Sequence, residues 1–149
     1  MAGFFWSLLA VAAGAFIAVQ APINAQLSKG LGLPVLAAGF SFLSGAVVLM
    51  LVSAVVIRGQ QVAVDWRAPA TWLFVAGGIL GAGYVVTAVI LIPRIGTAAL
   101  MAFLVTGQLL AGMLLDRAGV LGLAVREITL GRLAGAVMLL AGALLIRLT

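Results

Sequence analysis

Long apolar stretches set the strongest constraint on what this chain can fold into. The 149 residues contain five almost wholly hydrophobic runs, separated by single charged residues or short polar connections. A run of about 20 apolar residues can cross the roughly 30 Å hydrocarbon core of a bilayer as a helix. We therefore predict an all-α integral membrane protein. The expected spans are residues 3–27, 33–57, 71–92, 97–115 and 130–146, in a single membrane domain covering residues 1–149.

The composition supports this class and excludes others. Hydrophobic residues make up 66% of the chain and charged residues 7%, so no separate soluble domain fits. The formal charge of +5 comes from single basic residues between the runs, a pattern of membrane-flanking anchors and not of nucleic-acid binding. The N-terminal run lacks a basic leader and is too long for a signal sequence, which predicts a retained first helix.

Cysteine and histidine are both missing from the sequence. A thiolate metal site is therefore impossible, and the commonest general base and metal ligand is unavailable. No pair of nucleophile and base is visible either. We expect neither enzymatic activity, nor a metal site, nor a cofactor.

A polar cluster interrupts the first span at VQAPINAQL. Gln20 and Asn24 are four residues apart, about 40° around an ideal helix, so they share one face. Pro22 lies between them and has no backbone N–H, so it breaks the hydrogen-bond pattern and frees the carbonyl of Ala18. Amides beside a proline-opened turn are a means by which transporters hold solutes inside the membrane. We predict that Gln20 and Asn24 bind substrate.

Polar groups in later spans extend the predicted lining. These are Tyr84 in the third span and Thr106 and Gln108 in the fourth. Polar side chains within spans usually face the bundle interior or a cavity, because lipid cannot satisfy them. The alternative is that the amides only tie helices together, which contributes on the order of 1 kcal/mol.

Three other polar groups receive local interpretations. Ser41 and Ser44 in the second span are expected to bond back to their own helix backbone. Asp116 ends the fourth span beside Arg117, which indicates a local ion pair or a turn cap; in a dimer it could instead lie in an access vestibule.

Charge counting leaves the membrane orientation weakly specified. One side would carry five arginines and the other three basic residues, Lys29, Arg94 and Arg147. The positive-inside rule needs a clearer asymmetry than this. Two copies could therefore insert in opposite orientations and form an antiparallel homodimer of ten helices, although a single orientation with a modest bias remains an alternative.

The chain resembles the YdcZ-like family of small bacterial inner-membrane proteins, within the drug/metabolite transporter superfamily. The motifs that carry the resemblance are PINAQL, FSFLSGAVVL, GGILGAGYV, FLVTGQLLAGMLLDRAG and GRLAGAVMLLAGALL, which together cover nearly the whole chain. The resemblance implies a multi-pass protein of the bacterial inner membrane that transports an unidentified small molecule. It also supports antiparallel assembly. The small multidrug resistance relatives carry a buried glutamate in the first helix, and no acid lies in the first span here.

These observations predict an alternating-access transporter of a small neutral, zwitterionic or anionic solute. Its partners would be the lipid bilayer and a second copy of the chain. Two alternatives belong to other classes: a small-ion or small-solute channel of the antiparallel dimer type, and a membrane assembly protein that transports nothing.

Overall fold

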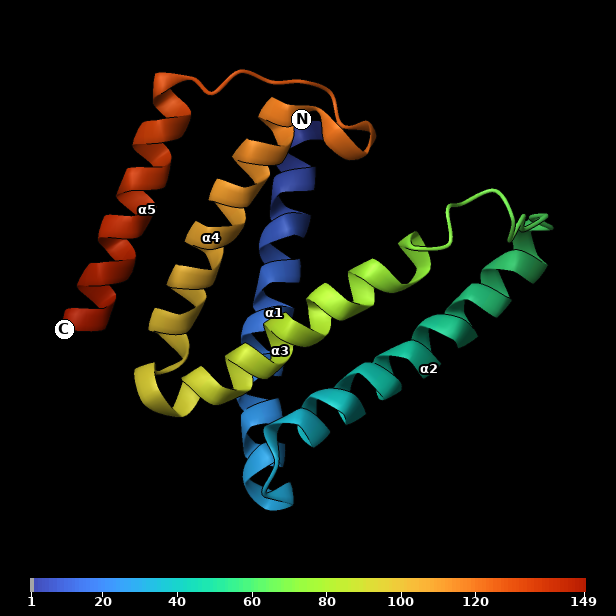
Figure 1. The fold of residues 1–149 in the computed structure, drawn as a ribbon, viewed down its shortest axis with the longest axis horizontal. Helices are drawn as coiled ribbons and strands as arrows, with labels where there is room; N and C mark the ends of the chain where they lie inside the picture. Colours follow the sequence, from blue (N-terminus) through green and yellow to red (C-terminus); the bar gives the residue numbers. More distant parts are fainter. Residues whose placement is uncertain (1) are drawn as a thin grey trace. The chain divides into compact units, whose positions relative to one another are not determined.

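Five long α-helices make up the described part of the chain, and each overlaps one of the expected spans. The computed structural model describes residues 2–149 (Figure 1). By length and composition, all five helices are capable of crossing a membrane. Their bounds are α1 (Ala2–Leu31), α2 (Pro34–Gln60), α3 (Leu73–Ile95), α4 (Thr97–Ala118) and α5 (Leu130–Leu148), with a short 3₁₀ turn, η1 (Val120–Gly122), between the last two.

The first two helices are joined by a tighter connection than we expected. A turn was expected over residues 28–32, but α1 continues to Leu31 and only Gly32 and Leu33 separate it from α2. Gly32 has φ of +73°, a conformation that glycine adopts without strain, and its N–H donates to the Ser28 carbonyl at 2.9 Å. Pro34 occupies the first turn of α2, where no N–H is needed.

Two prolines lie inside continuous helices, although Pro22 was expected to open a turn of the first span and Pro93 to lie in the turn between the third and fourth spans. Helix α1 passes through Pro22, and α3 passes through Pro93 to end at Ile95. The expected turn over residues 93–96 is therefore wrong, and Gly96 alone, with φ of +79°, separates α3 from α4. A proline removes only one hydrogen bond of the helix, which flanking turns can tolerate within a membrane.

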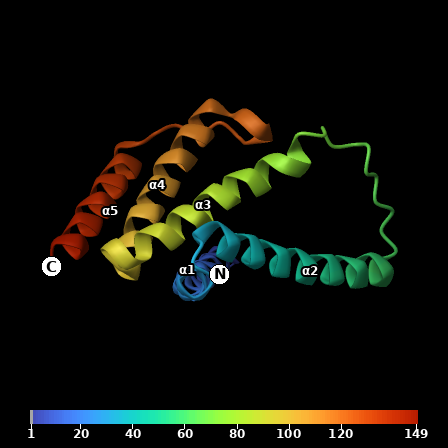
Figure 2. The ribbon, with the colours of Figure 1, turned by 60° about the horizontal axis from the view of Figure 1, so that its bottom comes forward.

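The chain divides into two compact units between Pro93 and Arg94. In the first unit, α2 begins beside the end of α1 and then diverges from it (Figures 1 and 2). Its apolar core joins α2 to α3, because Ala38 packs with Val85 and Val89. At Gly81 of α3 an added Cβ would lie 2.9 Å from the Phe42 ring of α2, so this side chain packs against the α3 backbone there.

The second unit is a helical hairpin in which α4 and α5 lie side by side (Figure 2). Helix α4 ends at Ala118 and is capped by Gly119, which has φ of +62°. The connection then folds back, and the Arg126 N–H donates to the Asp116 carbonyl at 2.9 Å. Thr129 caps α5 by accepting the Arg132 N–H at 3.3 Å.

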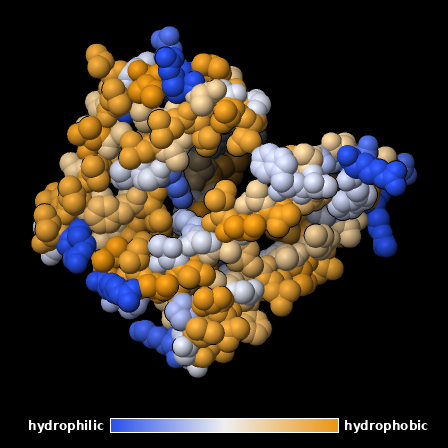
Figure 3. All heavy atoms as spheres, in the orientation of Figure 1, coloured by the Kyte–Doolittle hydropathy of each residue, from blue (hydrophilic) through white to orange (hydrophobic). Residues whose placement is uncertain are grey.

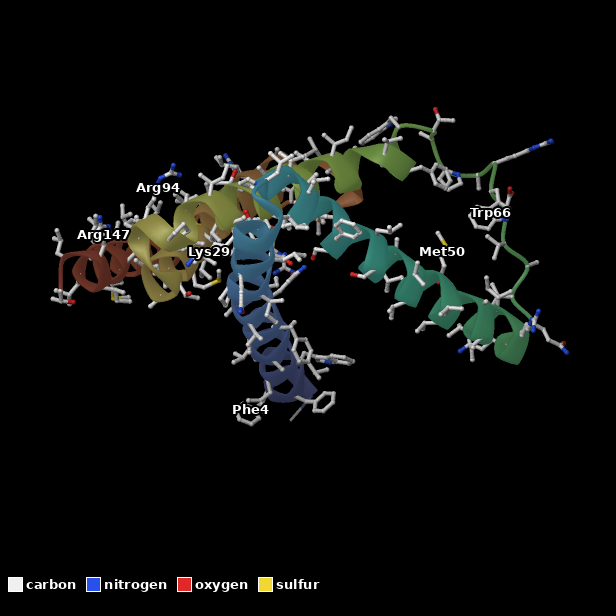
Figure 4. The ribbon with its side chains drawn as sticks, turned by 90° about the horizontal axis from the view of Figure 1, so that it is seen from below. Phe4, Lys29, Met50, Trp66, Arg94 and Arg147 are labelled. Atoms are coloured by element: carbon white, nitrogen blue, oxygen red, sulfur yellow. The ribbon has the colours of Figure 1, made fainter. Side chains whose placement is uncertain are left out.

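Most of the apolar surface of the single chain is exposed. In the most hydrophobic stretch of α2 no residue is buried, and hydrophobic colouring covers most of the visible face in Figure 3. Charged side chains lie toward helix ends: Lys29 is at the opposite end of α1 from Phe4, and Arg147 is near the end of α5 (Figure 4). Lipid or further helices must therefore cover the middle of the helices.

Gly119 is the position where the hairpin of the second unit is least tolerant of substitution. An alanine Cβ there would meet the Val125 side chain at 2.5 Å, and the left-handed backbone adds at least about 1 kcal/mol for any residue with a Cβ. We expect Gly119→Ala to lower the thermal unfolding midpoint of the purified protein. Gly142→Ala, in a helix with open space around it, should leave the midpoint nearly unchanged. Equal midpoints for the two variants would contradict the close contact.

Candidate functional site

The hydroxyl of Ser41 joins the two predicted amides of the first unit. Gln20 Nε2 donates to Ser41 Oγ at 2.9 Å, and Asn24 Nδ2 donates to the same oxygen at 3.2 Å. The expectation that Ser41 bonds to its own helix is therefore wrong. Ser44 does so instead, because its hydroxyl donates to the Ser41 carbonyl at 3.0 Å. The shared hydroxyl links α1 to α2.

The hydrogen bonds within this cluster show which of its polar groups remain available to a ligand. A serine oxygen has two lone pairs, and the two amides occupy both of them. The Ser41 O–H remains, and it donates no hydrogen bond within the described residues. Asn24 is only 5% exposed, whereas Gln20 is exposed and its side-chain carbonyl is not bonded in the described part of the chain. Asn24 thus holds the serine in place, and Gln20 and Ser41 present the available groups.

Tyr84 lies across a narrow gap from these amides. The gap separates α1 from α3, and its volume of about 10 Å³ admits about one water molecule. Its lining consists of Ile17, Gln20, Ala21 and Asn24 from α1, and Tyr84, Val85, Ala88 and Val89 from α3. The structure therefore brings three of the five predicted binding residues together.

A wider groove adjoins the same cluster. It has a volume of about 290 Å³, close to the lower end of ordinary ligand pockets, which is about 300 Å³. Gln20 and Ser41 supply its polar groups, and Phe42, Gly45, Ala46 and Leu49 of α2 supply its apolar walls. Gln20 faces both the narrow gap and this groove. A small solute could contact the cluster from the groove.

The other two predicted binding residues belong to the second unit. Thr106 is buried, and its hydroxyl donates to the Ala102 carbonyl of its own helix at 2.9 Å. Gln108 is exposed and lines a separate groove between α4 and α5. Within the described residues its amide makes no hydrogen bond, so it is free for a ligand or for another chain.

Asp116 pairs with a different arginine from the one expected. Arg132 Nη1 of α5 lies 3.3 Å from Asp116 Oδ2, so the ion pair bridges two helices. The expectation of a local partner at Arg117 is wrong. Adjacent positions on a helix point in different directions, whereas the hairpin brings the beginning of α5 beside the end of α4.

The two polar clusters differ in chemistry. The cluster of Gln20, Asn24 and Ser41 carries no charged group and offers only neutral donors and acceptors. The α4–α5 groove carries the Asp116–Arg132 pair. Among residues 2–149 no three metal-ligating side chains gather into a possible metal site. Neither cluster has the nucleophile and base of a hydrolytic centre.

A family model matches residues 5–145, nearly all of the described helices. Its description is "Putative inner membrane exporter, YdcZ". The chain belongs to the YdcZ family. This YdcZ-family protein is accordingly a multi-pass protein of the inner membrane, and its family description implies a transporter and not an enzyme. No curated protein and no solved structure matches the chain.

The roles of two residues in these clusters of the YdcZ-family protein, Ser41 and Arg132, were not predicted from the sequence. Ser41 could have been found from the hairpin register, since Asn24 lies eight residues before Gly32 and Ser41 eight residues after Leu33. In an antiparallel helix pair such positions lie opposite each other. The pairing of Asn24 with Ser41 can be recognised in the sequence only if the turn at residues 32–33 is predicted correctly. Arg132 carries no comparable signal, because the connection before α5 is irregular.

Proposed function

We propose that this YdcZ-family protein is an alternating-access transporter of a small neutral, zwitterionic or anionic solute, and that it works as an antiparallel homodimer. The observation that carries the proposal is the hydroxyl of Ser41, which accepts hydrogen bonds from Gln20 and Asn24 and leaves its own O–H available. Polar groups inside an apolar span are costly unless they are bonded or face a cavity. Here they border a groove.

The chemistry of the cluster favours uncharged polar edges on the solute. The Ser41 O–H is a donor, the Gln20 side chain supplies an acceptor, and Tyr84 lies nearby across the narrow gap. No acid or base of the first unit lines the gap or the groove. The phosphate or carboxylate of an anionic solute would need the positive charge of another part of the assembly.

Antiparallel pairing would allow the protein to alternate between an inward-facing and an outward-facing state. In an antiparallel homodimer the inward-facing and outward-facing forms are the same structure inverted, so they are equal in free energy by symmetry. Two features support the pairing: the weak asymmetry of five basic residues against three, and the large apolar surface that a single chain leaves exposed. Gln20 and Asn24 of both copies would border a shared pathway.

A thermal-shift screen of small polar solutes tests the site. A solute that binds the folded form raises its unfolding midpoint. We expect Gln20→Ala to weaken the binding of such a solute about five- to tenfold, the equivalent of one lost hydrogen bond. The matched control is Gln26→Ala, since Gln26 is also an exposed amide on α1 but lines neither the gap nor the groove.

Flux measurements distinguish transport from its rivals. Uptake of the solute into proteoliposomes should saturate and should be accelerated by the same solute on the opposite side. Ion or solute flux far above transporter rates would instead indicate a channel. Equal binding by the Gln20→Ala and Gln26→Ala variants would contradict the site and favour a role of the amides in helix assembly alone.

A further inference from the structure

The groove between α4 and α5 combines a charged end with apolar walls. Its volume is about 420 Å³, within the range of about 300–1,000 Å³ found for small-molecule sites. The groove is lined by Gln108, Leu109, Gly112, Met113 and Asp116 of α4, and by Arg132 and Gly135 of α5. The two glycines leave room because they carry no side chain.

The charged end lies where a lipid headgroup would be. Asp116 is two residues from the end of α4, and Arg132 is two residues from the beginning of α5. Gln108 is eight residues earlier on α4, or about 12 Å deeper along the helix. The groove thus runs from the charged end past the apolar side chains of Met113 and Leu109, and the amide of Gln108 lies at its deep end. A charged end followed by apolar walls matches the headgroup and the first part of the chain of an amphiphile.

Arg132 retains most of its hydrogen-bonding capacity. Only Nη1 is used, at 3.3 Å from Asp116 Oδ2 and 3.5 Å from the Glu127 carbonyl. The Nε and Nη2 groups donate nothing within the described residues. A guanidinium has five N–H donors in a planar fork that suits phosphate and carboxylate oxygens. The side chain is 33% exposed, so a ligand can reach these donors.

The surrounding charge favours an anion over a cation. The end of α4, the connection and the beginning of α5 carry Arg117, Arg126 and Arg132 against Asp116 and Glu127, an excess of one positive charge. The groove lining itself holds one acid and one base, so the excess positive charge comes from the neighbouring residues of the chain. Basic pockets between membrane-spanning helices commonly bind acidic headgroups. Asp116 both holds Arg132 in the groove and competes for its charge.

We propose that this groove is a binding site for an amphiphile with an anionic headgroup, held by Arg132, whose apolar chain lies along Leu109 and Met113. The site is separate in composition from the cluster around Ser41. The proposal does not rest on the transport function proposed above, because binding alone is its readout.

Dodecyl phosphate is a suitable probe of binding to the groove. Because the natural sequence has no cysteine, a single introduced thiol can report on the occupancy of the groove. In a Gly135→Cys protein in a neutral maltoside detergent, the single thiol lies in the groove. We expect dodecyl phosphate to slow its reaction with a maleimide and to raise the unfolding midpoint of the unmodified protein. Dodecyltrimethylammonium, with the same chain and the opposite charge, should do neither. Equal effects of the two amphiphiles would overturn the proposal.

Two substitutions with opposite expected signs separate binding from a structural ion pair. Arg132→Gln should weaken dodecyl phosphate binding roughly tenfold or more, because hydrogen bonds to a charged group are lost. Asp116→Asn should strengthen it, because the asparagine carbonyl can still accept a hydrogen bond from Arg132 while the competing negative charge disappears. Arg126→Gln, an arginine of the same connection outside the groove lining, should weaken binding much less than Arg132→Gln, because it removes nearby charge but no contact in the groove. A weaker affinity of the Asp116→Asn variant for dodecyl phosphate would contradict the proposal. This variant can still test the proposal if Arg132→Gln fails to fold.

The source of the amphiphile is distinguished by a second pair of measurements. Stabilisation by dioleoyl phosphatidylglycerol in phosphatidylcholine nanodiscs, abolished by Arg132→Gln, would assign the groove to a membrane lipid. Stabilisation by dodecyl phosphate without any effect of phosphatidylglycerol would assign it to a single-chain solute. An absence of stabilisation by both overturns the anionic site.

Discussion

Replacing Ser41 by alanine should destabilise this protein more than any other single polar change in α1 or α2. The substitution removes the acceptor of two hydrogen bonds at once and leaves the amide of Asn24, which is only 5% exposed, without its partner. An unsatisfied buried donor costs about 1–3 kcal/mol, although membrane-embedded hydrogen bonds average nearer 0.6 kcal/mol. We expect a loss of about 1–3 kcal/mol, measured as a lower unfolding midpoint in detergent.

Ser44→Ala is the matched control for Ser41→Ala. Ser44 lies on the same helix and bonds only to the Ser41 carbonyl of its own backbone, so its removal should have little effect. A double-mutant cycle between Asn24→Ala and Ser41→Ala isolates the interaction between the two side chains. A coupling free energy of zero would show that Asn24 and Ser41 do not hold each other. The same Ser41→Ala protein should also lose the binding of a solute whose affinity is lowered by Gln20→Ala, because both residues line the same groove.

Biasing the membrane orientation should abolish dimerisation in an all-or-none manner. Gln60 is the last residue of α2 and Val62 lies just after it, and both are exposed. Changing both to lysine raises the number of basic residues on that side from five to seven, against three on the other side. A strong bias fixes one orientation under the positive-inside rule. If the functional unit is antiparallel, this variant expressed alone should have no partner of the opposite orientation.

An oppositely biased variant should restore the dimer on coexpression. Gly30→Lys and Leu33→Lys add two charges on the other side, and Arg58→Gln with Arg67→Gln removes two, so the count becomes three against five. Orientation is measured by introducing Gly30→Cys into the natural sequence and into the first biased variant, and by applying an impermeant maleimide from each side. The natural sequence with this cysteine should label from both sides. Labelling from one side only, or a stable dimer of the first biased variant alone, would contradict the antiparallel arrangement.

The candidate site was predictable in part. Gln20 and Asn24 were expected on one helical face because they are four residues apart, and the structure places both on the Ser41 hydroxyl. Their partner was missed because a serine or threonine in an apolar helix ordinarily bonds to its own backbone, as Ser44 and Thr106 do. Whether these residues bind a solute remains a prediction.

The partner of Asp116 in the α4–α5 groove was predicted wrongly for a different reason. Sequence proximity suggested Arg117 as the partner of Asp116, but the connection over residues 119–129 brings Arg132 to it instead. That connection depends on the left-handed backbone at Gly119 and on the hydrogen bond from the Arg126 N–H to the Asp116 carbonyl. Neither the backbone conformation of Gly119 nor this hydrogen bond leaves a periodic pattern that could be recognised in the sequence.

The sequence by itself determined that this is a five-helix membrane protein, because the length of an apolar run decides whether it can cross a bilayer, and that property depends on no distant contact. It also determined the absence of thiol and imidazole chemistry. Only the tertiary structure decided which polar groups meet. Side chains with a reach of a few ångströms can bond across helices only at positions that the turns bring into register, and the turns at Gly32 and Gly119 depend on single backbone conformations.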